Sequence, residues 1–152
     1  GMQMAVIEFA RNVLGFNKAN STEMDINCKY PVISMMESQK NIKEKGGTMR
    51  LGSWKCVLEN NSLAYKIYST NEINERHRHR YELNFEFMKE LSQNGMVFSG
   101  KNPDTGLVEI IELSDHPWFF GVQFHPEYRS TVEEPQPVFV SFVKASLSHK
   151  NK

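Results

Sequence analysis

The chain has 152 residues, enough for one domain with a core of its own. Lysine and arginine together number 18, as do aspartate and glutamate, so the formal net charge is zero. A protein that binds nucleic-acid phosphates or an anionic membrane needs a surplus of cations, so we expect neither partner.

The hydropathy pattern and the cysteine usage indicate the cellular compartment of the protein. No apolar stretch approaches the ~20 residues that cross a bilayer, and no secretory signal pattern stands at the start. The two cysteines, Cys28 and Cys56, form neither a CxxC pair nor a disulfide framework. We therefore expect a reduced, cytoplasmic setting.

The first half of the chain predicts a helix over roughly residues 3–14, ended by Gly15. This helix is apolar on most sides, so we expect the chain to be a fragment, or Gly1 to be an expression remnant. A short strand is predicted over residues 30–36, and a polar loop over 37–45. A strand near residues 48–58 comes next, and Ser62 is a good N-cap for a short helix that ends at Tyr68.

The second half predicts a helix over residues 85–93 that ends at Asn94 and Gly95. Strands over 96–100 and 107–113 are joined by the turn residues of 102–106. A further strand covers 119–124, and a last helix over 137–148 begins with a proline in its first turn. No repeat or linker divides the chain.

His125 and Glu127 are the leading candidates for catalysis. They stand in the sequence Gln-Phe-His-Pro-Glu, directly after an apolar strand. A neutral imidazole shuttles a proton near neutral pH, and a neighbouring carboxylate fixes its tautomer. The alternative is a histidine and a glutamate without chemistry in a surface turn. A histidine–carboxylate pair usually serves a nucleophile elsewhere in the fold.

A basic cluster covers residues 76–80, with arginine and histidine in alternation. It is either a solvated charged edge or a rim that binds a carboxylate or docks another domain through arginine pairs. A metal site is weakly indicated, because two histidines at i and i+2 share a strand face without an evident third ligand.

Two other segments and the two cysteines decide nothing by themselves. Residues 20–23 fit a plain hydroxyl or Asx turn, and residues 46–52 lack the Lys-Ser/Thr ending of a phosphate loop. Cys28 and Cys56 are poor nucleophile candidates, because neither stands at a strand-to-helix elbow.

Taken together, five segments resemble the glutaminase domain of the CTP synthases, which are class I glutamine amidotransferases. They cover residues 1–3, 20–23, 46–52, 75–82 and 123–127, in the family's order and at compatible spacing. The resemblance runs from Gly1 to about Ser148. The strings GGTMRLG and ERHRHRYE are specific to CTP synthases among amidotransferases, whereas HPE alone indicates the wider class.

The resemblance implies a three-layer α/β fold of the flavodoxin-like type, with a mostly parallel sheet and ligands at its C-terminal edge. In the family, the elbow Cys-Leu-Gly-Met-Gln carries the nucleophile, and this sequence begins at the glycine of that string. We therefore expect residues 1–152 to form a partial glutaminase domain. The nucleophile, the oxyanion donors and the first strands of the sheet are expected to be missing, and the chain is expected to be inactive alone.

The same resemblance assigns the site residues. His125 is the expected general base and acid, and Glu127 orients it. The residues expected to form the pocket for L-glutamine are Gly1, Met2, Gln3, Glu23 and Arg80, the last through its backbone at the rim.

The resemblance also implies partners. The expected partners are L-glutamine and the synthase domain, which binds ATP and Mg²⁺ and aminates UTP to CTP; no cofactor or metal is expected in this chain. A homo-oligomer is expected, because helix 3–14 and a strand edge would be left uncovered. Two alternatives remain: a related amidotransferase whose nucleophile is supplied elsewhere, and a non-catalytic binding or scaffold module that has kept the pocket.

Overall fold

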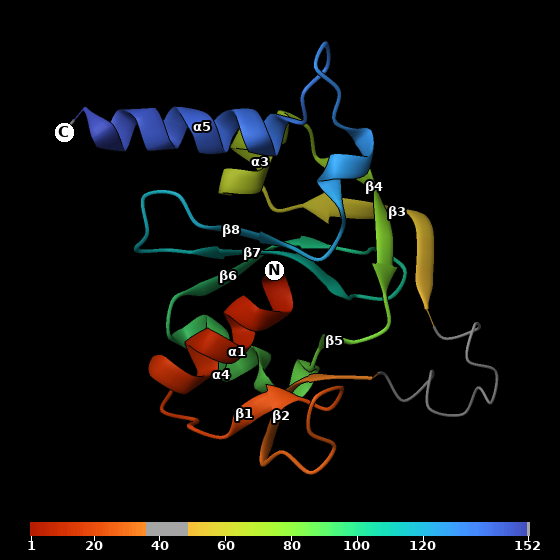
Figure 1. The fold of residues 1–152 in the computed structure, drawn as a ribbon, viewed down its shortest axis with the longest axis vertical. Coiled ribbons are helices and arrows are strands. Elements are labelled where there is room, and N and C mark those ends of the chain that lie inside the picture. The colour runs from red at the N-terminus through yellow and green to blue at the C-terminus, as the bar shows by residue number, and fades with distance from the viewer. Residues whose placement is uncertain (36–48, 152) are drawn as a thin grey trace.

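A computed structural model describes residues 1–35 and 49–151 (Figure 1). Its helices are α1 (Met2–Asn12), α3 (Leu63–Tyr68), α4 (Met88–Gln93) and α5 (Pro137–Lys150), with 3-10 turns η1 (Phe85–Phe87) and η2 (Pro126–Arg129). Its strands are β1 (Ala19–Ser21), β2 (Tyr30–Ser34), β3 (Arg50–Leu58), β4 (Glu72–His79), β5 (Glu82–Leu83), β6 (Met96–Lys101), β7 (Val108–Leu113) and β8 (Phe120–Val122).

Most predicted elements are present within one or two residues of the expected bounds. The Ser62 hydroxyl accepts a hydrogen bond from the Tyr65 N–H at 3.0 Å, which confirms the predicted N-cap of α3. Between β6 and β7, Oδ1 of Asn102 accepts hydrogen bonds from the N–H groups of Asp104 and Thr105, so the predicted turn is confirmed. The expected loop over 37–45 and the glycines of 46–47 lie outside the described residues.

The larger sheet has five strands in the order β4-β3-β6-β7-β8, and all its neighbouring pairs are antiparallel. The described strands therefore differ from the expected mostly parallel sheet. The reason lies in the connections: β6, β7 and β8 follow one another through short turns, and only antiparallel neighbours can be joined that way. A parallel neighbour needs a crossover of about a dozen residues or more.

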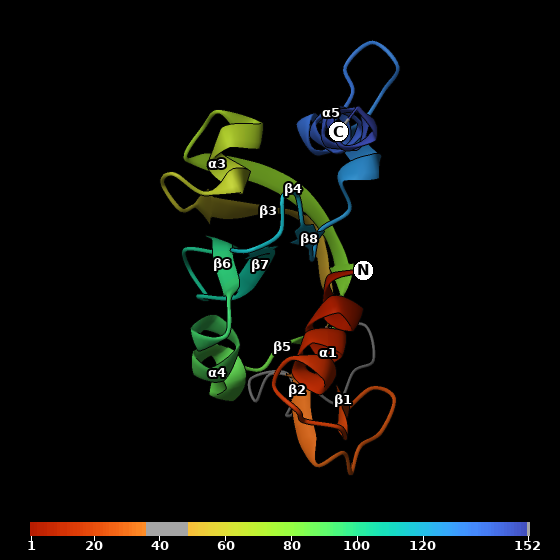
Figure 2. The same ribbon diagram turned by 90° about the vertical axis from the view of Figure 1, so that its left-hand side faces the viewer.

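A second sheet has three strands in the order β1-β2-β5, with one parallel pair, β1 with β2. The turned view shows this sheet, α1 and α4 at one end of the molecule, and the larger sheet with α3 and α5 at the other (Figure 2). Strand β1 was not predicted, but the hydroxyl turn that residues 20–23 fit is present, since the Glu23 N–H donates to the Ser21 hydroxyl.

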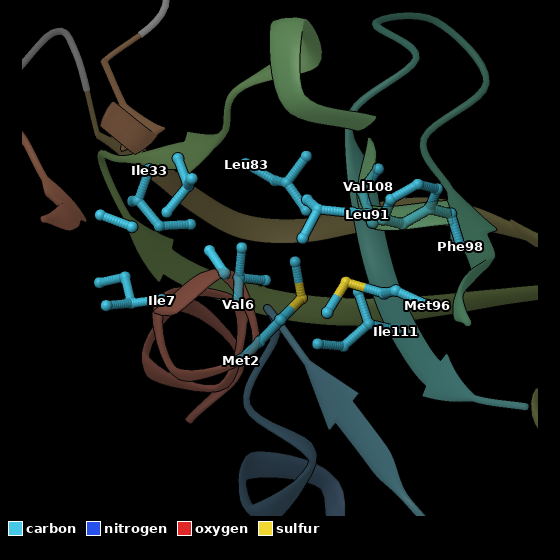
Figure 3. Packing of buried hydrophobic residues seen from close by; sticks show 13 residues of the cluster. Met2, Val6, Ile7, Ile33, Leu83, Leu91, Met96, Phe98, Val108 and Ile111 are labelled. Carbon is cyan, nitrogen blue, oxygen red and sulfur yellow. The ribbon is translucent and has the colours of Figure 1, made fainter. Parts of the chain in front are cut away.

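The main hydrophobic core joins these two regions through α1. Met2, Val6 and Ile7 of α1 pack in one cluster with Ile33, Leu83 and Ile111 (Figure 3). At Gly121 in β8, a Cβ atom would lie 2.7 Å from Cγ1 of Ile111 and 3.7 Å from the Met2 Cα. The missing side chain therefore allows Ile111 of β7 to pack closely against β8. The start of α1 lies at ordinary contact distance from the same point, so residues 1–3 lie beside the segment that leads to His125.

The expectation that helix 3–14 would be left uncovered is wrong, because its apolar face is buried in this core. One group of exposed apolar residues lies on α5, of which only Val138 is buried. Its exposed apolar residues are Phe139, Phe142, Val143 and Leu147. The homo-oligomer stays a prediction. Among the described residues, no helix has the length and apolar character needed to span a membrane.

Candidate active site

His125 and Glu127 form a hydrogen-bonded pair at the end of β8. Their side chains meet at 2.7 Å, Nδ1 to Oε1. The backbone fixes the turn, because the His125 N–H donates to the Arg76 carbonyl of β4 at 2.8 Å and Pro126 begins η2. The Tyr128 ring stacks on the imidazole with 5.2 Å between ring centroids.

The electrostatics of this pair define the tautomer of His125. Slight burial raises the pKa of Glu127, but the hydrogen bond from His125 and a backbone hydrogen bond outweigh it, so the net shift of the pKa is downward. Glu127 is therefore an ionised acceptor at neutral pH, and Nδ1 of His125 must carry the proton. The lone pair of the neutral imidazole is then on Nε2, the nitrogen available for proton transfer.

A pocket of about 410 Å³ adjoins this turn. The first turn of α1, the loop after β1 and the segment 122–127 form its walls. Its lining includes six of the predicted site residues, namely Gly1, Met2, Gln3, Glu23, His125 and Glu127. Glu23 is held by a local turn, in which its N–H donates to the Ser21 hydroxyl at 3.1 Å.

Arg80 is the predicted site residue that, among the described residues, does not line this pocket. Its two neighbours connect to the pocket instead. His79 is part of the lining, and the Tyr81 carbonyl accepts a hydrogen bond from Nε2 of Gln3 at 2.9 Å. The expected contact of Arg80 with glutamine stays a prediction.

Sequence reasoning missed Gln123, a second residue that binds the Tyr81 carbonyl. Gln123 is 6% exposed, and its Nε2 lies 2.8 Å from the Tyr81 oxygen and 3.0 Å from Nδ1 of His79. Gln123 also lines the pocket. A signal was available, because Gln123 is two residues before His125 in an extended segment, where side chains at i and i+2 point the same way.

The basic cluster lies on β4, where alternate side chains face opposite sides. Glu75 and His77 are buried and His79 is nearly so, whereas Arg76 and Arg78 are exposed. The interpretation of the cluster as a rim therefore fits Arg76 and Arg78, which line a separate hollow with Leu51, His77 and Tyr128. Binding of a carboxylate or of another domain by these arginines stays a prediction.

The inward side of β4 joins a buried ionic network. Arg50 lies 3.4 Å from Glu82 and 2.8 Å from Glu109, nitrogen to oxygen in both cases. Burial raises the pKa of Glu82 to about 8, against the opposing effect of Arg50, and burial likewise raises the pKa of Glu109. Burial and then Arg50 lower the pKa of His77 to about 3 and of His79 to about 4. Both histidines are therefore neutral at pH 7, so their contacts of 3.5 and 3.3 Å with glutamate are not ion pairs.

His77, His79 and Glu109 offer ligand atoms that all lie within 4.8 Å of one another. The third ligand that the sequence did not reveal is thus present on β7. However, Nδ1 of His77 and Nε2 of His79 lie 2.9 Å apart, a hydrogen-bond distance, and Arg50 accompanies the carboxylate. The cluster is explained as a hydrogen-bonded network, and the expected lack of a metal in this chain stays a prediction.

Neither cysteine lies at the pocket. Cys56 is fully buried in β3, and burial strongly raises the pKa of its thiol. Cys28 precedes β2, and partial burial raises the pKa of its thiol as well. A thiolate nucleophile needs the opposite shift, so the two cysteines of this chain do not supply one.

Comparisons with known proteins decide the family. The family model for glutamine amidotransferase class-I matches residues 1–145. The chain belongs to the class I glutamine amidotransferase family. In the solved structure of the Trypanosoma brucei CTPS glutaminase domain with bound acivicin, the matching part has a TM-score of 0.89 and 38% identity. It covers 97% of this chain and 58% of that chain, and it confirms the predicted fold class.

Comparison with curated relatives shows which amidotransferases the chain resembles. The chain is 62% identical over 152 residues to the CTP synthase of Flavobacterium psychrophilum and 60% identical over 152 residues to that of Christiangramia forsetii. All of this chain is covered in both cases, and it spans 28% of the length of each relative. The resemblance to the glutaminase domain of CTP synthases is confirmed.

Proposed function

We propose that this chain is the part of a CTP synthase glutaminase domain that carries the proton-transfer pair and most of the glutamine pocket. In the intact enzyme, glutamine is hydrolysed and its ammonia serves the ATP-dependent amination of UTP to CTP. The observation that carries this proposal is the shared pocket: His125 and Glu127 line the same cavity as residues 1–3 and Glu23.

The geometry supports one assignment of roles in glutamine hydrolysis. A cysteine thiolate, which the pocket lining does not contain, attacks the side-chain amide carbon of glutamine and forms a tetrahedral intermediate. Nε2 of His125 takes the proton of that thiol and then donates it to the leaving nitrogen, so that ammonia departs and a thioester remains. Nε2 next takes a proton from water, whose oxygen attacks the thioester, and passes this proton to the departing sulfur, which releases glutamate and the thiol. Glu127 stabilises the imidazolium that forms in these steps.

The isolated 152 residues should bind L-glutamine without hydrolysing it. The pocket lining holds no cysteine, and both thiols of the chain have raised pKa values away from it. Ammonia release from glutamine above background, abolished by His125→Ala, would contradict this expectation. Cys28→Ser and Cys56→Ser should leave glutamine binding unaltered, and a loss in either would mean that the site is misplaced.

A chimera tests the hydrolytic role directly. Residues 1–152 would replace the matching 152 residues of the F. psychrophilum enzyme, to which they are 62% identical. We expect the chimera to form CTP with either glutamine or ammonia as nitrogen source. His125→Ala should abolish CTP formation from glutamine and leave that from ammonia, which shows that the synthase site is intact. A chimera that works with ammonia alone would instead favour a non-catalytic binding module.

A further inference from the structure

We infer that Gln123 is a positioning residue for the glutamine pocket: its amide holds the Tyr81 carbonyl and the His79 ring in place. This inference deepens the proposed function and rests on it for its effect on glutamine. The sequence gives Gln123 no evident role, because the proton-transfer pair of the same segment is complete without it.

The first step concerns what one side-chain amide can satisfy. The NH₂ group of Gln123 has two hydrogens and no lone pair to offer. Its nitrogen lies 2.8 Å from the Tyr81 carbonyl oxygen and 3.0 Å from Nδ1 of His79. A third acceptor, Oε2 of Glu82, lies farther from this nitrogen, at 3.4 Å. We therefore assign the two hydrogens to the two nearer acceptors. Because Gln123 is 6% exposed, water does not replace these partners easily.

The second step concerns which ring nitrogen carries the hydrogen in His79 and in His77. Since Nδ1 of His79 accepts from Gln123, the hydrogen of this neutral ring is on Nε2. That nitrogen lies 2.9 Å from Nδ1 of His77, which then accepts. The donor at Gln123 thus fixes the tautomer of His79, and His79 fixes that of His77. Without this donor, His79 has no reason to keep Nδ1 unprotonated beside the Tyr81 oxygen at 3.2 Å and Glu82 at 3.3 Å.

The third step is the connection to the pocket. The Tyr81 carbonyl accepts from Gln3 of α1 as well as from Gln123, at 2.9 and 2.8 Å. One oxygen therefore links α1 with the segment before His125 and with the connection between β4 and β5. Gln3, His79 and Gln123 all line the pocket. Loss of the Gln123 amide should therefore make the positions of Gln3, His79 and residue 123 in the pocket lining less fixed. The hydrogen bond between His125 and Glu127 lies within its own turn and should remain.

The variant Gln123→Met keeps the length of the side chain and removes the donor. Its matched control is Gln136→Met, because Gln136 is also buried, at 9% exposure, but lies at the start of α5 and not in the pocket lining. In the chimera, Gln123→Met should raise KM for glutamine roughly tenfold, the effect of about one hydrogen bond, with a smaller change in kcat. CTP formation from ammonia should be unchanged, and Gln136→Met should change neither.

A spectroscopic measurement on the 152-residue chain needs no glutamine. Ring ¹⁵N chemical shifts should show His79 unprotonated at Nδ1 in the wild type, and the Gln3 side-chain NH₂ protons should exchange with solvent far more slowly than those of the exposed Gln93. In Gln123→Met, the His79 tautomer should change and the Gln3 protons should exchange faster. A wild-type His79 that carries its proton on Nδ1 would overturn the inference, even if the variant fails to fold.

The two measurements separate the possible failures. If the unmodified chimera makes no CTP from glutamine while the tautomers are as expected, the proposed function fails and the positioning of Tyr81 stands. If the chimera uses glutamine and Gln123→Met leaves KM unchanged, the positioning role is wrong and the proposed function stands.

Discussion

Two regions of this molecule pair histidine with glutamate, and they differ in access to water. At the end of β8, the side chains of His125 and Glu127 are 37% and 54% exposed. Around β4, the side chains of His79 and Glu82 are 9% and 2% exposed. The pKa of the exposed glutamate is lowered, whereas that of the buried one is raised to about 8.

The difference shows that residue type alone does not reveal a catalytic pair. Burial penalises charge on both partners, so the inner histidines stay neutral and serve as hydrogen-bonding structure. At the exposed turn, the carboxylate stays charged and supports proton transfer by the imidazole. The pairs are connected, since the Arg76 carbonyl of β4 accepts the His125 N–H. We expect the inner network to control stability and the outer pair to control chemistry.

The largest effect should come from Arg50→Met. This change removes the cation that lies 2.8 Å from the buried carboxyl of Glu109, and breaking a buried ion pair typically costs about 3–5 kcal/mol. Denaturant unfolding followed by circular dichroism would measure it. The control is Lys55→Met, which breaks an exposed pair with Glu72 and should cost no more than about 1 kcal/mol. Equal losses in both variants would contradict a special role of the inner network.

The next effect is the pH dependence of stability. Burial raises the pKa of Glu82 to about 8 and of Glu75 to about 7, from an ordinary 4.5. The native state holds these protons more tightly, so the stabilisation is full below about pH 4.5 and is lost as the pH rises to about 8. The lowered pKa values of His77 and His79 act at the other end, where stabilisation is lost as the pH falls from 6.5 toward 3.

Maximum stability should therefore lie between about pH 4.5 and 6.5, where the two contributions oppose each other. The melting temperature should fall by several degrees between pH 6.5 and 8. In Glu82→Gln, this fall in melting temperature should be smaller. A melting temperature that rises over this interval would show that the carboxyls are ionised in the native state.

The smallest effect on stability should come from the outer pair. His125→Ala removes an exposed side chain and should change the free energy of unfolding by less than about 0.5 kcal/mol. It should raise the pKa of Glu127, because the hydrogen bond from His125 is the largest of the effects that lower it. Carboxyl ¹³C shifts over a pH titration would measure this change, with His149→Ala as the control. An unchanged Glu127 pKa would mean that the two side chains do not pair in solution.

Local signals in the sequence predicted much of this structure. The Ser62 cap and the turn at Asn102 each depend on neighbouring residues alone, and both are present. The first helix is present as well, but it ends at Asn12, before the expected stop at Gly15. The turn that holds His125 and Glu127 follows from a strand and a proline that stiffens the chain. The period-2 alternation of β4 was also readable, since it separates Glu75 and His77 from the arginines.

Contacts between distant segments could not be read in this way. The Glu109 carboxylate meets His77 from a strand that follows it by 32 positions, and Gln3 reaches the Tyr81 carbonyl across 78. Such contacts depend on sheet order and on the packing of α1, which no local pattern specifies. The antiparallel order of the larger sheet was missed for a different reason. Its short connections were visible in the sequence, but the expectation of a mostly parallel sheet came from the family resemblance, which describes a whole domain.

The most direct test of the central claim is an NMR titration of the 152-residue chain with L-glutamine. If the pocket beside the His-Pro-Glu turn receives glutamine, binding will be saturable, and the largest shift changes will occur at Gln3, Glu23 and His125. The account would be contradicted by the absence of saturable binding, or by shift changes confined to other surfaces such as the hollow between Arg76 and Tyr128.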